Sequence, residues 1–162
     1  LFLQGTARCD HTVHPLCSRA RRLLVQGVVE APDDVVRHDL RVPGMKKLLD
    51  MVPCQEVGVT YDPANYAASG SDPYEALLAI GDRVRYTHWK DVSRTDGKTA
   101  YEAFGEGVID WPPIVSYLLK SFDGLWSIEY ELKVEAGLDR LIDGTRRSVE
   151  NLMGVVRSCR QS

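Results

Sequence analysis

Three short apolar segments of the sequence each lead into a side chain that can bind a metal ion. Residues 57–61 lead into Asp62, residues 84–87 into His88 and residues 125–128 into Glu129. Strand ends and loops carry chemistry more often than strand interiors, which pack. Two carboxylates and an imidazole suit a divalent cation such as Mn²⁺, Mg²⁺ or Co²⁺. Three protein ligands also leave coordination positions for substrate oxygens and water, as catalysis by a metal requires.

The periodicity around these residues predicts an alternation of helices and strands. The predicted helices cover residues 43–52, 73–80, 111–120 and 137–159, and the predicted strands cover residues 57–61, 84–88 and 125–130. Such alternation is typical of parallel βα units. Because parallel strands end at the same edge of a sheet, we expect Asp62, His88 and Glu129 to meet there. Taken singly, each of the three is better explained as a helix cap or an ordinary ion pair than as a metal ligand.

Two stretches do not fit the regular pattern. Residues 90–110 predict a long polar loop, which is a candidate functional segment because of its length. Residues 1–42 contain six arginines, no lysine and a single apolar run at 23–29, which predicts at most one diverged strand. We therefore divide the chain into a poorly patterned segment, 1–42, and a patterned domain, 43–162.

A cluster of potential zinc ligands lies in the N-terminal segment, at Cys9, His11, His14 and Cys17. No second ligand pair follows at the spacing of a zinc finger. A loosely packed terminus is therefore the favoured interpretation.

Composition indicates which classes of partner and which cellular compartment are favoured. The chain has a net charge of −3, so nucleic acids and acidic membrane surfaces are not favoured partners. No apolar run approaches the roughly 20 residues that span a bilayer. The four cysteines are irregularly spaced, which does not indicate a disulfide framework and favours a reducing cytoplasm.

Four motifs carry a resemblance to a known family. In chain order they are Tyr61-Asp62-Pro63-Ala64-Asn65, Thr87-His88-Trp89-Lys90-Asp91, the stretch 104–111 and the stretch 124–131. Together they resemble the sugar phosphate isomerase/epimerase family, whose fold is the xylose isomerase-like TIM barrel and which is distantly related to endonuclease IV. The resemblance covers about residues 42–151. It implies an α/β fold: a partial (βα)8 TIM barrel made of the last three or four βα units, with parallel strands.

The resemblance also implies residue roles. Asp62, His88 and Glu129 would bind the metal, and Glu129 would also act as an acid/base carboxylate. Arg94, Lys90 and Asn65 would contact the substrate, a sugar or sugar phosphate. The implied reaction removes a proton next to a carbonyl and passes through an enediolate that the metal stabilises. Two simpler interpretations stay open: Lys90 as a solvated strand-end charge, and Arg94 as an ion-pair partner of Asp91 or Asp96.

The sequence also departs from the family. A TIM barrel needs eight strands and about 250 residues, whereas three strands are clear here. The family's fourth metal ligand has a single candidate, Glu30, which lies 32 residues before Asp62. One hypothesis is that the chain is a truncated or mis-started reading of a longer barrel gene.

Two other functions stay open. One is a non-catalytic half-barrel that associates with a partner or with itself as a homo-oligomer. The other is an endonuclease IV-like hydrolase, which is disfavoured because that class uses further histidines and only His88 lies in the patterned region.

Overall fold

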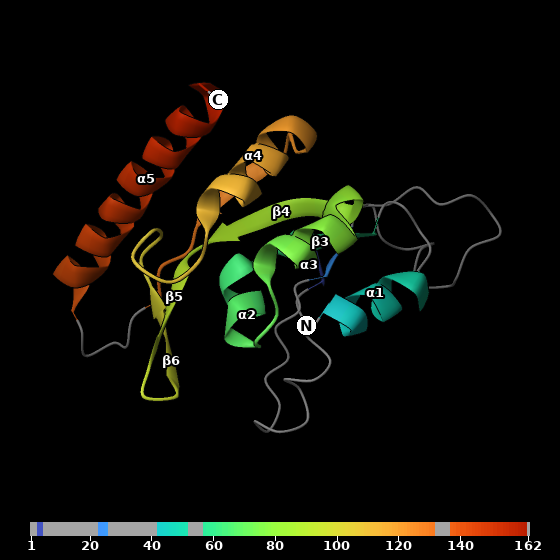
Figure 1. Ribbon diagram of the computed structural model, residues 1–162, viewed down its shortest axis with the longest axis horizontal. Helices are drawn as coiled ribbons and strands as arrows, with labels where there is room; N and C mark the ends of the chain where they lie inside the picture. The colour runs from blue at the N-terminus through green and yellow to red at the C-terminus, as the bar shows by residue number, and fades with distance from the viewer. Residues whose placement is uncertain (1–2, 5–22, 26–41, 52–56, 132–136, 162) are drawn as a thin grey trace.

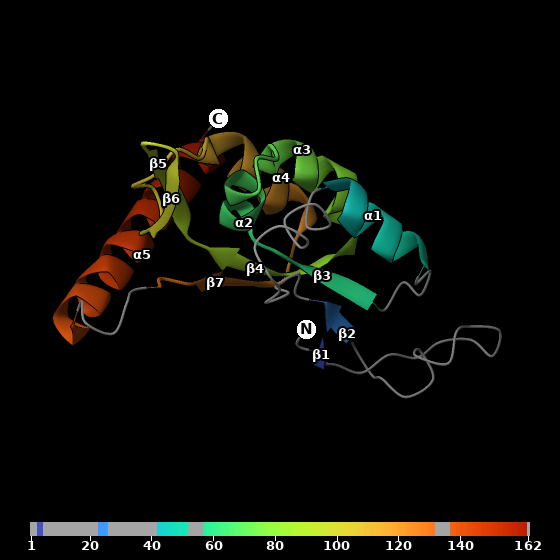
Figure 2. The same ribbon diagram turned by 90° about the horizontal axis from the view of Figure 1, so that it is seen from below.

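Four parallel strands lie side by side in the order of the sequence. They are β2 (Leu23–Val25), β3 (Val57–Tyr61), β4 (Val84–Trp89) and β7 (Leu125–Ile128), and β1 (Leu3–Gln4) pairs antiparallel with β2 at one edge. The computed structural model describes residues 3–4, 23–25, 42–51, 57–131 and 137–161 (Figure 1). Within these ranges the four parallel strands form the partial barrel that the sequence predicts, and the antiparallel β1 extends the sheet at one edge (Figure 2).

Helices cover one face of this sheet. They are α1 (Val42–Met51), α2 (Pro63–Ala68), α3 (Pro73–Ile80), α4 (Trp111–Ser121) and α5 (Leu138–Gln161), with a short 3₁₀ turn, η1 (Gly81–Arg83), before β4. Figure 2 shows α1, α3 and α4 above the same face of the strands. Neighbouring helices contact one another in the order α1, α3, α4, α5.

Local sequence explains where these helices begin. The Asp72 side chain accepts a hydrogen bond of 2.9 Å from the Glu75 N–H, and Pro73 takes the first position of α3. A carboxylate cap followed by proline is a strong helix start, because it satisfies a backbone donor that has no partner within the helix. The apolar residues of α3 and α4 then pack on the sheet; those buried include Leu77, Ile80, Ile114, Val115 and Leu118.

An aromatic cluster fills the core where β4 meets β7. Trp89 stacks on Trp126 with ring centroids 4.8 Å apart and planes inclined by 21°. Trp89 also lies 5.5 Å from Trp111 and 5.8 Å from Phe104, centroid to centroid. Offset-stacked and edge-on aromatic pairs of this kind contribute stability beyond the area they bury.

Most element predictions are confirmed. Strand 57–61 and helix 73–80 have the predicted bounds. The helices at α1, α4 and α5 and strand β4 differ from the prediction by at most two residues at either end. The strand predicted at 125–130 ends earlier, at Ile128. The six-residue helix α2 was not predicted, because it is too short to show an apolar period.

The prediction of a loop over residues 90–110 is wrong for its first half. Strands β5 (Asp91–Thr95) and β6 (Lys98–Glu102) form an antiparallel hairpin there. Asp96 and Gly97 connect them with φ angles of 51° and 73°. Positive φ at both central residues is the geometry of a type I′ turn, for which Asp-Gly is a preferred sequence. The Asp96-Gly97 dipeptide therefore predicts a hairpin, although the polar composition of residues 90–110 as a whole indicates a loop.

Several sequence predictions lie outside the described residues. These are the cluster Cys9, His11, His14 and Cys17, and the candidate ligand Glu30. Among the helices of the described ranges, none is both long enough and apolar enough to cross a membrane.

Candidate metal centre

Asp62, His88 and Glu129 meet at the carboxyl-terminal edge of the sheet. Strand register explains this convergence: Tyr61 lies opposite Thr87 in the β3–β4 pair, and Trp89 lies opposite Ile128 in the β4–β7 pair. Each of the three side chains offers one ligand atom, and these atoms all lie within 4.8 Å of one another. The structure therefore brings the three residues together at this edge, as the sequence predicts.

The three side chains differ in their access to solvent. Asp62 is buried, whereas His88 and Glu129 are half-buried. His88 Nδ1 lies 3.1 Å from Glu129 Oε2 and 4.0 Å from Asp62 Oδ2. A hydrogen bond of 3.1 Å from the Glu129 N–H to the Trp89 carbonyl fixes the backbone at the end of β7. The site is thus closed on the Asp62 side and accessible on the Glu129 side.

Asn65 holds the Asp62 carboxylate in place. The Asn65 backbone N–H donates to Asp62 Oδ1 at 3.1 Å, and its side-chain Nδ2 donates to Oδ2 at 2.9 Å. Asp62 is therefore also the N-cap of α2. Burial raises the pKa of the Asp62 carboxyl, whereas the Lys90 ammonium and the Asn65 N–H act in the opposite direction.

Lys90 lies inside the site and not in solvent, so its interpretation as a solvated strand-end charge is wrong. Its side chain is 4% exposed, and Nζ lies 2.7 Å from Glu129 Oε2, 3.3 Å from Asp62 Oδ2 and 3.4 Å from Glu131 Oε1. Burial by itself lowers the pKa of Lys90, but these three carboxylates outweigh burial and raise it well above its ordinary value. The ammonium is therefore charged at neutral pH.

Glu129 is ionised in this arrangement. The hydrogen bond from His88, followed by the contacts from Lys90, lowers the pKa of Glu129 to about 2, although burial acts against them. A carboxylate that stays ionised at neutral pH is available as a metal ligand.

Tyr101 is a member of the site that the sequence analysis missed. Its hydroxyl donates to Asn65 Oδ1 at 2.7 Å, and its ring centroid lies 4.5 Å from Lys90 Nζ. A lysine ammonium over an aromatic face at this distance is a cation–π contact. The β5–β6 hairpin brings Tyr101 there, so the Asp96-Gly97 turn is the signal that could have revealed it.

Asp91, which directly follows Lys90, has a structural role. Its carboxylate is buried and accepts hydrogen bonds from Trp111 Nε1 at 2.8 Å, from the Val92 N–H at 2.8 Å and from the Ile109 N–H at 3.3 Å. These bonds tie the start of β5 to the start of α4.

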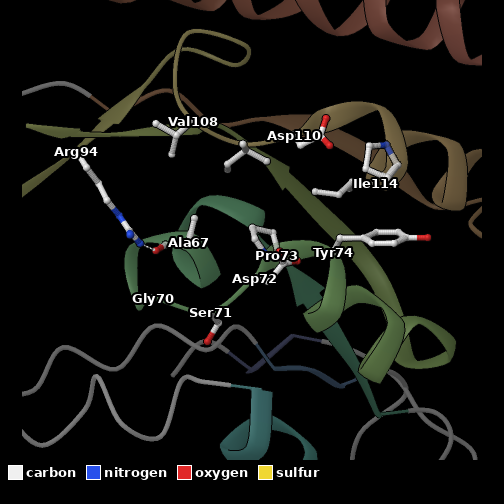
Figure 3. A pocket seen from close by; sticks show the side chains of 12 residues that line it. Ala67, Gly70, Ser71, Asp72, Pro73, Tyr74, Arg94, Val108, Asp110 and Ile114 are labelled. Carbon is white, nitrogen blue, oxygen red and sulfur yellow. Dashed lines mark hydrogen bonds between the residues drawn. The ribbon is translucent and has the colours of Figure 1, made fainter.

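Arg94 makes its hydrogen bond to helix α2 and not to the carboxylates of the site. Its guanidinium donates to the Ala67 carbonyl, and the side chain lines a cavity of about 400 Å³ between the hairpin and the starts of α3 and α4 (Figure 3). Asp62, His88, Lys90 and Glu129 are not among the residues that line this cavity. Arg94 thus contacts a backbone carbonyl, and not Asp91 or Asp96 as the simpler interpretation expects. A role for Arg94 in substrate binding stays a prediction.

The donor atoms fit a divalent cation. Ligands bound to one ion at 2.0–2.2 Å lie about 3 to 4 Å from one another, and the separations of 3.1 Å and 4.0 Å from His88 Nδ1 fall in this range. Two carboxylate oxygens with one imidazole nitrogen suit ions such as Mn²⁺, Co²⁺ and Zn²⁺. Asp62, His88 and Glu129 would hold the ion, and Asn65 would orient the first of them.

Comparison with protein families matches residues 8–152 to the xylose isomerase-like TIM barrel. The chain belongs to this family. A comparison with curated protein sequences finds no match.

Solved structures support the same fold. A xylose isomerase domain protein from Planctomyces limnophilus matches with a TM-score of 0.66 and 20% identity, over 88% of this chain and 49% of that one. A D-tagatose 3-epimerase-like protein matches with a TM-score of 0.56 and 15% identity, over 85% and 48% of the two chains. The IOLI protein with a bound zinc atom matches with a TM-score of 0.54 and 21% identity, over 85% and 49%. The chain thus spans about half the length of these three proteins.

Proposed function

We propose that Asp62, His88 and Glu129, at the carboxyl-terminal rim of the sheet, form the metal centre of a sugar or sugar-phosphate isomerase or epimerase. The observation that carries the proposal is the convergence of Asp62, His88 and Glu129 within 4.8 Å, each from the end of a different parallel strand. Membership of the xylose isomerase-like family supports it. So does the similarity of fold to a zinc-bound protein and to an epimerase-like protein.

Each residue of the site has a distinct role in this proposal. Asp62, His88 and Glu129 would hold the cation, and a bound cation would supply Lewis-acid polarisation of a substrate carbonyl, which would acidify the neighbouring C–H. Asn65 keeps Asp62 oriented through two hydrogen bonds. Lys90 and Tyr101 form one wall of the site, where an ammonium can donate a hydrogen bond to a sugar oxygen.

Glu129 has two proposed roles with different demands on its pKa. A pKa of about 2 suits a metal ligand. A general base works best when its pKa lies near the operating pH. Acid/base work by Glu129 therefore depends on His88 and Lys90 ceasing to donate to its carboxylate.

Metal binding is the first test. We expect purified protein to bind Mn²⁺, Co²⁺ or Zn²⁺ in calorimetric titration, and His88→Ala to lose that binding. His38→Ala is the matched control, because it removes a histidine that the proposal leaves out of the site. Equal metal binding by the wild type and His88→Ala would refute the site.

The reaction is tested by proton exchange. A panel of ketoses, aldoses and their phosphates is incubated with metal-loaded protein in D₂O, and NMR follows deuterium entering the carbon next to the carbonyl. Exchange that needs both the metal and Glu129 supports isomerase or epimerase chemistry. Protein that binds no metal and associates as its concentration rises indicates the non-catalytic half-barrel instead.

A further inference from the structure

The oxygens best placed to bind the cation are already in contact with an ammonium group. Lys90 Nζ lies 2.7 Å from Glu129 Oε2 and 3.3 Å from Asp62 Oδ2. These are the same two oxygens that face His88 Nδ1, at 3.1 Å and 4.0 Å. The positive charge that balances Asp62 and Glu129 in this structure is therefore supplied by the chain itself.

A second position for the ammonium lies beside the first. Glu131 Oε1 is 3.4 Å from Nζ, and the Glu131 side chain is 50% exposed. The Tyr101 ring lies 4.5 Å from Nζ and offers its electron-rich face. The lysine stem has four carbons and is flexible, so the head group can shift toward these two residues without movement of the backbone.

We infer that Lys90 and the divalent cation compete for Asp62 Oδ2 and Glu129 Oε2, and that the ammonium moves toward Tyr101 and Glu131 when the cation binds. The inference rests on the proposed metal centre and adds a built-in competitor to it. Lys90 keeps two buried or half-buried carboxylates paired when the cation is absent, and it limits how tightly the cation is held.

Distance and burial explain why a bound cation displaces the Lys90 ammonium. A cation bound to Glu129 Oε2 at about 2.1 Å stands within about 5 Å of an ammonium that has not moved. The Lys90 side chain is 4% exposed, so water screens this repulsion poorly. Moving toward Glu131 lengthens the separation and retains a negative partner.

A simpler alternative is that Lys90 only ties β3, β4 and β7 together through its ion pairs. A purely structural lysine would affect folding, and its removal would leave metal affinity unchanged or lower it. Competition predicts the opposite change in affinity.

Charge removal is the decisive test. Mn²⁺ affinity is measured on the full chain by calorimetry and by the electron paramagnetic resonance signal of free Mn²⁺. We expect Lys90→Met to bind Mn²⁺ about tenfold more tightly than the wild type, equivalent to about 1.4 kcal/mol. Lys90→Arg keeps the charge and is expected not to tighten binding. The exposed Lys98→Met is the control and is expected to match the wild type.

Glu131 tests the second position for the ammonium, first with Lys90 in place and then in the Lys90→Met background. We expect Glu131→Gln to weaken Mn²⁺ binding severalfold in the wild type and much less in the Lys90→Met background. Equal weakening in both backgrounds would mean that Glu131 acts through its own charge only, and would overturn the proposed movement.

The outcomes separate this inference from the proposed function. If neither the wild type nor Lys90→Met binds Mn²⁺, the metal centre and the competition both fail. If the wild type binds, Asp62→Asn abolishes binding and Lys90→Met binds no more tightly, the metal centre stands and the competition is refuted. Binding by Lys90→Met alone supports the competition directly.

Discussion

Replacing Asn65 with alanine removes the two side-chain contacts that join Asp62 to Tyr101. The variant loses the Nδ2 donor to Asp62 Oδ2, at 2.9 Å, and the Oδ1 acceptor of the Tyr101 hydroxyl, at 2.7 Å. It keeps the backbone N–H bond to Asp62 Oδ1 at 3.1 Å. The change therefore removes one hydrogen-bond donor from a buried carboxylate without removing the carboxylate.

The structure sets the expected size of the effect. A hydrogen bond to a charged group contributes about 1.5–3 kcal/mol. Lys90 still contacts Asp62 Oδ2, at 3.3 Å, so we expect the lower end, about 1.5 kcal/mol less free energy of unfolding. Loss of a hydrogen bond that orients a metal ligand costs about 10-fold to 100-fold in affinity, and we expect Mn²⁺ binding to weaken by about the smaller factor.

Urea denaturation measures the loss of stability, and Mn²⁺ calorimetry measures the loss of metal affinity. Asn151→Ala is the matched control, since Asn151 Nδ2 also donates a hydrogen bond, at 2.8 Å to the Phe104 carbonyl, but lies outside the site. It should lose stability and keep its metal affinity. If Asn65→Ala binds Mn²⁺ as tightly as the wild type, or if Asn151→Ala weakens binding equally, Asn65 does not orient a metal ligand.

Three further substitutions test the scaffold, all by urea denaturation. Trp111→Phe removes the 2.8 Å donor to the buried Asp91 carboxylate and should cost about 2 kcal/mol; an unchanged unfolding midpoint would contradict the anchoring of β5 to α4. Gly97→Val places a side chain at a φ of 73° with no atom within 4 Å of its Cβ, so a loss of about 1–2 kcal/mol would come from the backbone alone. Gly154 lies inside α5, and a Cβ added there also meets no atom within 4 Å. Gly154→Ala should therefore raise the free energy of unfolding by about 0.5–1 kcal/mol; a loss of stability would mean that the added methyl group clashes with a neighbour of α5.

Local signals made much of the fold predictable. The Asp72 cap, Pro73 and the apolar spacing of α3 lie within a few residues of one another, so the sequence alone defined that helix. The convergence of Asp62, His88 and Glu129 was predictable for a different reason: alternating helices and strands imply parallel pairing, and parallel strands end at one edge.

The environment of Lys90 could not be predicted in the same way. Its carboxylate partners come from the ends of β3 and β7, so its burial depends on how three strands associate. The position of Arg94 is a similar case. The family resemblance implied a place for Arg94 in the site, but the hairpin that carries Arg94 brings its guanidinium to the Ala67 carbonyl.

The aromatic cluster between β4 and β7 gives the protein an intrinsic optical probe. All three tryptophans of the chain, Trp89, Trp111 and Trp126, belong to it, and Trp89 immediately precedes Lys90. Tryptophan emission therefore reports on a single region beside the rim, and a paramagnetic ion bound there would quench it. The stacked pair, 4.8 Å apart, is close enough for its transition dipoles to couple and give a circular dichroism signal specific to the packed state. Unfolding followed by these signals and by helix content would coincide only if the sheet edge and the helices unfold together.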